Sequence, residues 1–497
     1  MKPANVVAVM DVGSNSGRVV VFERDTPAHL RALAGSRASL RLIADVDRRG
    51  ELSESTMGRV MDALRDFKAL AGGAGATRIA AVATAAMRDA SNGRLFAVRL
   101  RRELGISIEI ISGAEEARYG FTGAMRGLDV SSGLLFDVGG GSMQVTRFDR
   151  RQRGRGVSLP LGALRLSEQF LESDPPTRPQ LRRLREHVRA QLADAGVKRF
   201  ARGDCLVGTG GTLRNLAKID HAAQEYPIGT LHGYDLPLDR LRETVELLAS
   251  LKEKRRDNLQ GLSAERADSI VGGAVAIQTV AEFIGAASIT VSSQGVREGL
   301  ALQLLGVPAG SPEAVRTASL SSLVARFAGW RRETATRREG LASVLYRTLE
   351  PRGPAMVAAA VRRTAGVLDI GRALDVTNRH AHVADIVLTT ELTGFTHAEL
   401  ALLAAIVRRA GNRHADVGSL AAIGGVDPAV VERASIVLAL SDEIEARCPP
   451  GRSITVRSRV GRDVTLSIPV LRSWLEGDLD KRFARAFGRE LVVSKST

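Results

Sequence analysis

Two stretches of the chain repeat one pattern: an apolar run, an aspartate, a loop of glycine and small polar residues, and a second apolar run. They lie at residues 6–23 and 134–148. Short apolar runs bounded by turn residues predict strands, and a tight loop between two of them predicts a hairpin. Both loops read D-V-G-x-x-S, at residues 11–16 and 137–142. The same loop in the same strand context predicts an internal duplication.

Both loops offer hydrogen-bond donors to an anion. Glycines let backbone N–H groups approach a phosphate without a Cβ in the way, and hydroxyl and amide side chains add further donors. We therefore expect two half-domains to hold one polyanion between these loops. The expected phosphate-binding residues are Gly13, Ser14, Asn15, Ser16, Gly139, Gly140, Gly141 and Ser142. Asp11, at the end of the first strand, can hold a cation or orient water.

Two further predicted strands end in charged residues. The strand at residues 79–84 leads into a helix that carries Arg88, which is either a surface charge or a clamp on a phosphate oxygen. The strand at residues 106–111 is followed by a helix that begins with Glu115 and Glu116. Adjacent helical residues point about 100° apart. Only one of these glutamates is therefore expected to face a cleft as the base that activates water, while acidic residues there also complement the helix dipole.

A third glycine-rich turn follows the strand that begins near residue 204. Its residues Gly210, Gly211 and Thr212 either contact an anion at the start of the next helix or only pack that helix on the strand. Arg297, at the start of another helix, is placed to reach the same anion.

The pattern changes after residues 306–313, which form a linker with two prolines. Residues 314–448 are rich in alanine and leucine at helical spacing, and strand-like residues return near the end as a predicted hairpin about Gly461 and Arg462. We therefore divide the chain into two α/β halves and a helical domain with a small β part: residues 1–130, 131–308 and 309–497.

Composition limits the number of domains and the kinds of partner that the chain can have. The chain has 497 residues, enough for two to four domains, and a net charge of +15. That charge favours a polyanionic partner, although it does not distinguish nucleic acid, polyphosphate and nucleotide. Cys205 and Cys448 are far apart and lack metal-ligand spacing, which fits a reducing, cytoplasmic setting. We expect neither a signal peptide nor a membrane span.

Taken in order, several segments resemble the exopolyphosphatase / guanosine pentaphosphate phosphohydrolase (Ppx/GppA) family. They are AVMDVGSNSGRVVVFE, ATAAMRDA, IEIISGAEEARYGF, LLFDVGGGSMQV, LPLGALRL, GTGGTLRNLA and VSSQGVREGL. LDIG, NRHAHVADIVL and ELTGFTHAELALLAAIVRR resemble the helical domain of that family. The resemblance implies an α/β fold of duplicated actin/hexokinase-like (ribonuclease H-like) halves with a cleft between them. It also implies a C-terminal, mainly helical, degenerate HD-like domain.

The resemblance further implies hydrolysis of the terminal phosphoanhydride of polyphosphate or guanosine pentaphosphate, with Mg²⁺, in a homodimer. Glu116 matches the catalytic glutamate of the family, Asp137 the metal-associated aspartate and Arg88 the phosphate-binding arginine. We expect Asp11 and Asp137 to hold the metal. The expected partners are inorganic polyphosphate or guanosine penta- or tetraphosphate, with no specific nucleic acid and no membrane.

The sequence is compatible with three functions. An exopolyphosphatase is favoured by the +15 charge, and a guanosine pentaphosphate phosphatase would use the same machinery. A non-catalytic sensor is favoured by Gln144, because Met143 and Gln144 stand where the family commonly has T-E, and glutamine lacks a charge that can hold metal or water. In the helical domain, Leu368 and Asp369 replace the His-Asp pair of HD phosphohydrolases. We therefore expect no independent metal chemistry there, with His380 and His382 structural or facing an anion.

Overall fold

A computed structural model describes residues 5–474 and 477–494, and the chain divides into two compact units. The first unit contains the chain up to Tyr226 together with Leu231–Ala318. The second contains Pro227–Thr230 and the chain from Ser319 onwards. The boundary falls within α13 (Pro312–Val324).

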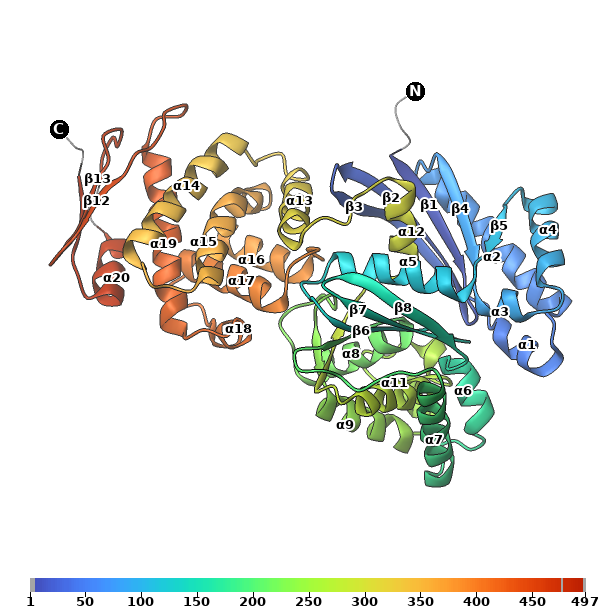
Figure 1. Ribbon diagram of the computed structural model, residues 1–497. Helices are drawn as coiled ribbons and strands as arrows, with labels where there is room; N and C mark the ends of the chain where they lie inside the picture. Colours follow the sequence, from blue (N-terminus) through green and yellow to red (C-terminus); the bar gives the residue numbers. More distant parts are fainter. Residues whose placement is uncertain (1–4, 475–476, 495–497) are drawn as a thin grey trace. The chain divides into compact units, whose positions relative to one another are not determined.

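The first unit contains two mixed sheets with equivalent strand orders (Figure 1). The first sheet has the order β3-β2-β1-β4-β5 and the second β10-β11-β9-β6-β7-β8. The strands of the first sheet are β1 (Val6–Val12), β2 (Ser16–Thr26), β3 (His29–Ser39), β4 (Arg78–Ala83) and β5 (Ile108–Ile110). Those of the second are β6 (Gly133–Val138), β7 (Met143–Asp149), β8 (Gln152–Leu159), β9 (Cys205–Thr209), β10 (Asp235–Pro237) and β11 (Ser288–Val291).

The strand pairing confirms the predicted duplication. In each sheet the leading strand, β1 or β6, pairs antiparallel with the next strand and parallel with a later one, β4 or β9. Both hairpin loops close with the same backbone hydrogen bond, from Gly13 N to Ser16 O at 3.1 Å and from Gly139 N to Ser142 O at 2.9 Å. The D-V-G-x-x-S repeat therefore forms the same turn twice. We call the two sheets with their helices lobe 1 and lobe 2.

Apolar residues on the inner faces of helices form the core of each lobe. Lobe 1 buries one face of its sheet against α1 (Leu42–Arg49), α2 (Glu54–Gly73), α3 (Ala85–Asp89) and α4 (Gly93–Leu104). Lobe 2 does so against α6 (Ala163–Phe170), α7 (Arg178–Asp194), α8 (Gly211–Ala223), α9 (Leu238–Ser250) and α11 (Ile270–Ile284). The short elements α10 (Glu253–Arg256) and η1 (Ala264–Arg266) precede α11.

Two helices pack apolar residues against the sheet of the opposite lobe. Phe121 and Met125 of α5 (Gly113–Arg126) pack against the second sheet, although α5 follows the last strand of the first. Leu300 and Leu302 of α12 (Val296–Leu304) pack against strands of the first sheet, although α12 follows β11 of the second. Figure 1 shows α5 between the two sheets and α12 beside β1 and β2. The apolar cores of both lobes thus depend on both halves of the sequence. The predicted domain boundaries stay a prediction.

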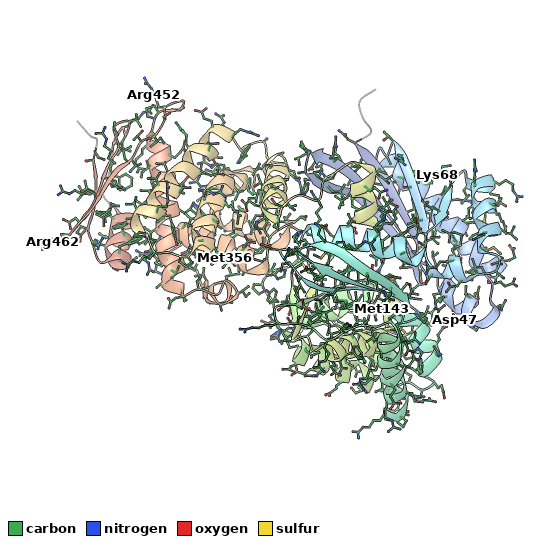
Figure 2. The ribbon with its side chains drawn as sticks, viewed as in Figure 1. Asp47, Lys68, Met143, Met356, Arg452 and Arg462 are labelled. Carbon is green, nitrogen blue, oxygen red and sulfur yellow. The ribbon has the colours of Figure 1, made fainter. Side chains whose placement is uncertain are left out.

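The second unit is mainly helical, with a small β part. Its helical elements are α14 (Arg332–Leu349), α15 (Ala355–Val367), η2 (Leu368–Ala373), α16 (Arg379–Thr389), α17 (His397–Gly411), α18 (Gly418–Ile423), α19 (Pro428–Arg447) and α20 (Asp478–Phe487). Its sheet has the order β12-β13-β14, formed by Arg457–Val460, Val464–Ser467 and Leu491–Ser494. The predicted hairpin about Gly461 is confirmed, and Arg462 beside its turn is exposed (Figure 2). The parallel strand β14 was missed in the sequence.

Arginines surround the buried acidic residues of the second unit. Arg338, which is fully buried, lies 2.6 Å from Asp369 and 3.1 Å from Asp442. Arg379 pairs with both carboxylates as well. Burial acts to raise the pKa of Asp369, but the nearby guanidinium groups outweigh it and lower that pKa. Cations of the chain itself therefore neutralise Asp369, and the HD-like assignment of this unit stays a prediction.

His380 contributes no charge to this cluster near neutral pH. Burial and the neighbouring Arg379 lower its pKa to about 4. Throughout the described ranges, every helix is too short or too polar to span a bilayer.

Candidate active site

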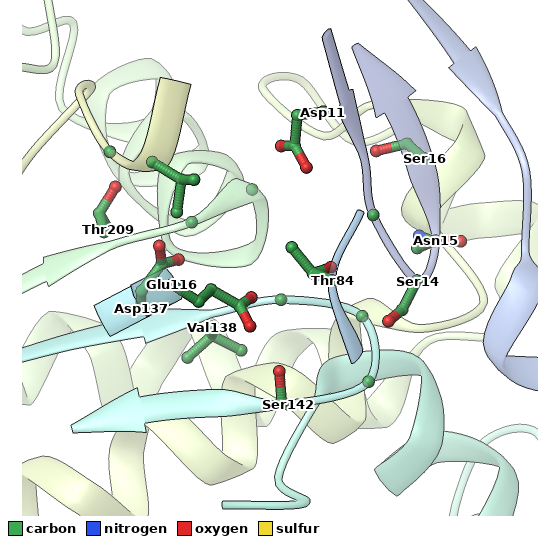
Figure 3. Close-up of a pocket in the computed structure, with 18 of the residues that line it drawn as sticks. Asp11, Ser14, Asn15, Ser16, Thr84, Glu116, Asp137, Val138, Ser142 and Thr209 are labelled. Atoms are coloured by element: carbon green, nitrogen blue, oxygen red, sulfur yellow. The ribbon is translucent and has the colours of Figure 1, made fainter. Parts of the chain in front are cut away.

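A cavity of about 110 Å³ lies between the two hairpin loops, which belong to different lobes (Figure 3). Its volume is that of about four water molecules, which suits a small tetrahedral anion. Most of the residues predicted from the sequence line it. They are Asp11, Gly13, Ser14, Asn15, Ser16, Glu116, Asp137, Gly139, Gly140, Gly141, Ser142, Gly210, Gly211 and Arg297.

Two predicted residues do not line the cavity. Thr212 is fully buried in α8, one residue beyond the third glycine turn. Arg88 of α3 instead donates hydrogen bonds to Ile111 O at 2.9 Å and to Glu116 Oε2 at 3.3 Å. Arg88 thus acts on the site through Glu116, and its predicted contact with phosphate stays a prediction.

The hairpin loops touch one another at their glycines. A Cβ at Gly140 would lie 2.7 Å from Asn15 Cβ, and one at Gly141 would lie 2.7 Å from Ser14 Oγ. Such distances are shorter than side-chain carbons tolerate, so these positions require glycine if the loops are to meet. Ser14 Oγ also accepts a hydrogen bond from Ala86 N, which ties the first loop to α3. The result is a narrow cavity with a glycine-containing hairpin loop on each of two sides.

The adjacent glutamates at the start of α5 have separate roles, as the sequence predicts. Glu115 and the N-cap residue Ser112 form a capping box, in which Glu115 Oε2 accepts from Ser112 N at 2.8 Å. Glu116 is 8% exposed and points into the cavity (Figure 3). Glu115 stabilises the helix, and Glu116 is the carboxylate available for chemistry.

The buried carboxylates around the cavity have raised pKa values. Burial is the main cause for each residue, and neighbouring carboxylates add to it: Asp137 and Asp11 at Glu116, Asp11 and Glu298 at Asp137, and Glu298 at Asp11. The pKa of Glu116 rises to about 8 and that of Asp137 to about 6, while the pKa of Asp11 is also raised. Arg88 and Arg297 oppose these shifts at Glu116 and Asp11, respectively. A carboxylate with a pKa near 8 is suited to general base or acid chemistry.

Asp11 and Asp137 fit a magnesium ion. Hard carboxylate oxygens suit Mg²⁺, which keeps several waters and commonly binds through one or two carboxylates together with substrate phosphates. A cation beside these residues would also relieve the repulsion that raises their pKa values. Over the described ranges, His, Cys, Asp and Glu side chains form no group of three or more with metal-binding geometry. Water and substrate oxygens would therefore complete the coordination.

The cavity also contains arginines that the sequence patterns did not indicate. Arg18, Arg214 and Arg266 line it together with Arg297, whose Nη1 lies 3.7 Å from Asp11 Oδ2. Burial and mutual repulsion lower the pKa of Arg18 to about 9 and that of Arg266 to about 10. Like-charged groups held this close to one another favour an anion of high charge density.

Only some of the missed residues left a signal in the sequence. The hairpin register pairs Asp11 with Arg18 and Asp137 with Gln144. Gln144 was already singled out in the sequence, and the same register could have placed Arg18 beside Asp11. Arg214 and Arg266 come from α8 and η1, and no local motif predicts that they meet. The other lining residues missed are Thr84, Val138, Thr209, Gly295 and Val296.

Two lobes of equivalent topology, with facing hairpin loops around a charged cavity, define an actin-like α/β fold. The sequence model of the Ppx/GppA phosphatase family matches residues 20–307, and the chain belongs to this family.

Several relatives of the chain carry the name exopolyphosphatase. The chain is 30% identical to exopolyphosphatase 1 of Mycobacterium tuberculosis over 327 residues, which cover 65% of this chain and 95% of that protein. It is 31% identical to exopolyphosphatase 2 of the same organism over 316 residues, which cover 60% of this chain and 98% of that protein.

Solved structures of the family resemble the chain over a similar share of its length. The Ppx/GppA family member of Aquifex aeolicus is 27% identical, with a TM-score of 0.53, and the match covers 61% of this chain and 98% of that one. An exopolyphosphatase from Cytophaga hutchinsonii is 25% identical, with a TM-score of 0.56, and the match covers 62% of this chain and 100% of that one.

Proposed function

We propose that the chain is an exopolyphosphatase, which hydrolyses the terminal phosphoanhydride bond of inorganic polyphosphate and releases orthophosphate. The observation that carries the proposal is the buried Glu116 carboxylate, which faces a cavity bounded by two glycine loops and a cluster of arginines. Membership of the Ppx/GppA family and relatives named exopolyphosphatases support the same reaction.

Substrate binding follows from the donors around the cavity. The terminal phosphoryl group sits between the hairpin loops, where backbone N–H groups and the hydroxyls of Ser14 and Ser142 surround its oxygens. Arg18, Arg214 and Arg266 hold the next phosphates of the chain, because a polyphosphate carries a negative charge on every unit. The net charge of +15 favours approach of such a polyanion.

Asp11 and Asp137 would hold Mg²⁺, which neutralises charge on the phosphoryl oxygens when bound. Glu116, once deprotonated, accepts a proton from water as the water oxygen attacks the terminal phosphorus. The bond between that phosphorus and the bridging oxygen breaks, and the shortened polyphosphate leaves with the bonding electron pair. The Arg88 guanidinium group favours the charged form of Glu116 and so keeps the base available.

The first experiment measures phosphate release with Mg²⁺ from long-chain polyphosphate and from guanosine pentaphosphate side by side. Faster release from polyphosphate supports the proposal. Release from the nucleotide alone would replace it with a guanosine pentaphosphate phosphatase. Binding of either compound without any release would replace it with a sensor, the function that Gln144 favours.

Glu116→Gln tests the assigned base, with Glu115→Gln as its matched control. Loss of a general base typically costs about 10²- to 10⁴-fold in rate, so Glu116→Gln should lose turnover while it retains polyphosphate binding. Glu115→Gln removes the charge of a surface capping box and should retain activity. An equal loss of turnover and binding in Glu116→Gln would contradict the role of Glu116.

A further inference from the structure

Two ion pairs join the lobes beside the cavity, and neither takes part in the proposed reaction. Arg37, near the end of β3 in lobe 1, pairs with Glu265 of η1 in lobe 2. Arg41, the N-cap residue of α1, pairs with Asp268, which follows η1 closely. We call residues 265–268 with these two ion pairs the clasp. The clasp fastens a short segment of lobe 2 to lobe 1 at both of its ends.

Arg41 connects the clasp to the first hairpin loop. Its backbone N–H donates to Asn15 O at 2.9 Å, and Asn15 lines the cavity. Arg41 has a φ of 52°, a left-handed conformation that residues other than glycine rarely adopt. Such conformations persist where the surrounding structure imposes them, and they are common at ligand clamps. The clasp is thus attached directly to a loop that bounds the cavity.

Arg266 lies between the two acids of the clasp in the sequence, and it lines the cavity. Its guanidinium group occupies the space beside Gly211. A Cβ at Gly211 would lie 2.2 Å from Arg266 Nη2 and 2.5 Å from its Cζ. The third glycine turn therefore makes room for this guanidinium group, a use that the sequence did not indicate.

The arginines of the site form a row from the carboxylates towards the surface. Burial raises the pKa of Asp137, and Arg214 and Arg297 lower it. Burial lowers the pKa of Arg266, and Arg214 and the exposed Arg37 lower it further. Arg266 thus lies beyond Arg214, on the side away from the carboxylates. A row of guanidinium groups suits the successive phosphates of a condensed phosphate.

We propose that the clasp positions Arg266 to bind the phosphate unit next to the reacting one. Glu265 and Asp268 are therefore positioning residues, which raise the affinity for an anion although they carry negative charge themselves. The clasp makes the site selective for condensed phosphates over orthophosphate, because orthophosphate between the hairpin loops does not extend to Arg266. The inference rests on the proposed function in taking a condensed phosphate as the ligand.

The test is titration calorimetry of the full chain with tripolyphosphate and with orthophosphate, in the presence of Mg²⁺. Every variant also carries Glu116→Gln, so that hydrolysis does not consume the ligand. Simple electrostatics predicts that Glu265→Ala with Asp268→Ala strengthens anion binding, since two negative charges are lost. The clasp predicts the opposite for tripolyphosphate, a loss of about three- to tenfold for two partly exposed ion pairs. Orthophosphate affinity should not fall.

Gly211→Ala tests the position of Arg266 without touching the clasp. Gly211 is the first residue of α8, where alanine suits the backbone, and its Cβ would displace the guanidinium group. Tripolyphosphate affinity should fall roughly 10- to 100-fold, the effect of losing a hydrogen bond to a charged group. In an Arg266→Ala background, neither Gly211→Ala nor the loss of the clasp acids should weaken binding further. A direct clash between the new Cβ and phosphate would persist in that background.

The matched control is Glu243→Ala, which removes an exposed acid of α9 outside the cavity lining. Both affinities should stay within about twofold, because a distant exposed charge is screened by salt. Unchanged thermal unfolding excludes misfolding as the cause of weaker binding. If loss of the clasp acids lowers the unfolding temperature, the Gly211→Ala cycle alone carries the test.

The outcomes separate the clasp from the proposed function. Unchanged or stronger tripolyphosphate binding without the clasp acids would overturn the role of the clasp. Equal losses with and without Arg266, or no tripolyphosphate binding by the Glu116→Gln chain, would overturn it as well. Binding that depends on the clasp, without phosphate release from polyphosphate by the wild-type chain, would overturn the proposed function and leave the clasp standing.

Discussion

Arg88 and Glu116 form an ion pair at the edge of the cavity, with Arg88 Nη1 3.3 Å from Glu116 Oε2. The same nitrogen donates to Ile111 O at 2.9 Å, which fixes the guanidinium group against the strand end before α5. Glu116 lines the cavity and Arg88 does not. Arg88 therefore influences the charge of Glu116 and does not itself line the cavity.

Removal of Arg88 should raise the pKa of Glu116 further, because the guanidinium group lowers it from the value that burial imposes. Arg88→Ala is therefore expected to shift the rise of kcat with pH to higher pH and to reduce kcat about tenfold or more at pH 7, since each pKa unit changes the charged fraction about tenfold. Arg88→Lys should restore part of the shift. A raised KM with an unchanged pH profile would instead favour a direct contact between Arg88 and phosphate.

The wild-type chain should itself show a pH dependence that responds to magnesium. Glu116 must be deprotonated to accept a proton, and its pKa is raised to about 8, so activity should increase as pH rises towards that value and fall below it. The charges of Asp11 and Asp137 contribute to the raised pKa, and a cation beside them offsets these charges. Initial rates against pH at several Mg²⁺ concentrations should show the midpoint moving to lower pH as Mg²⁺ increases. A midpoint independent of Mg²⁺ would contradict a metal at Asp11 and Asp137.

Gly140→Ala should separate the two hairpin loops without unfolding the chain. Its Cβ would lie 2.7 Å from Asn15 Cβ and 2.9 Å from Asn15 N, so the backbone of one loop would have to move. We expect a loss of about tenfold or more in kcat/KM, because misplacement of groups by about 1 Å can cost 10²-fold. Gly58→Ala is the matched control, since no atom lies within 4 Å of its Cβ in α2. That variant should be as active as wild type and up to about 1 kcal/mol more stable.

Arg165 connects the lobes on the surface and should contribute to stability rather than catalysis. From α6 it lies 2.9 Å from Asp47 of α1, which Figure 2 labels, and 3.2 Å from Asp89. Arg165→Ala should lower the free energy of unfolding by about 1 kcal/mol, the upper end for partly exposed pairs. Urea unfolding measures this change. The control variant Arg182→Ala removes an exposed pair with Glu186 within α7 and should change the free energy of unfolding little. Equal effects of both variants would contradict a bridging role for Arg165.

The sequence was most informative where the chemistry is local. The D-V-G-x-x-S loops, the strands around them and the carboxylates beside them lie within a few residues of one another, so the pattern predicted both the duplication and most of the cavity. Glu115 and Glu116 both lie in the first turn of α5, so helix geometry alone predicts that only one of them faces the cavity. The glycine loops and the carboxylates of the site could therefore be predicted from short segments of the sequence.

The arginine side of the site could not be predicted in the same way. Arg214 and Arg266 reach the cavity only because α8 and η1 pack together within lobe 2, and isolated arginines in a chain with 70 basic residues carry no pattern. The neutralisation of Asp369 by Arg338 likewise joins residues of two elements, α14 and η2, that are 31 positions apart in the sequence. The apolar pattern of a helix predicts that the helix is buried, but not which sheet it packs against. The sequence therefore did not predict that α5 and α12 pack against the sheet of the opposite lobe.

The packing of α5 and α12 on opposite lobes limits how the chain can be cut into fragments. A fragment that ends near residue 130 would carry Phe121 and Met125 on a helix with no sheet to cover them. It would also lack Leu300 and Leu302 over its own sheet, and the complementary fragment would have the opposite defects. Large exposed apolar faces of this kind cause aggregation. The two lobes share one strand order, yet each is expected to be unstable as a separate fragment because part of its apolar packing comes from the other half of the sequence.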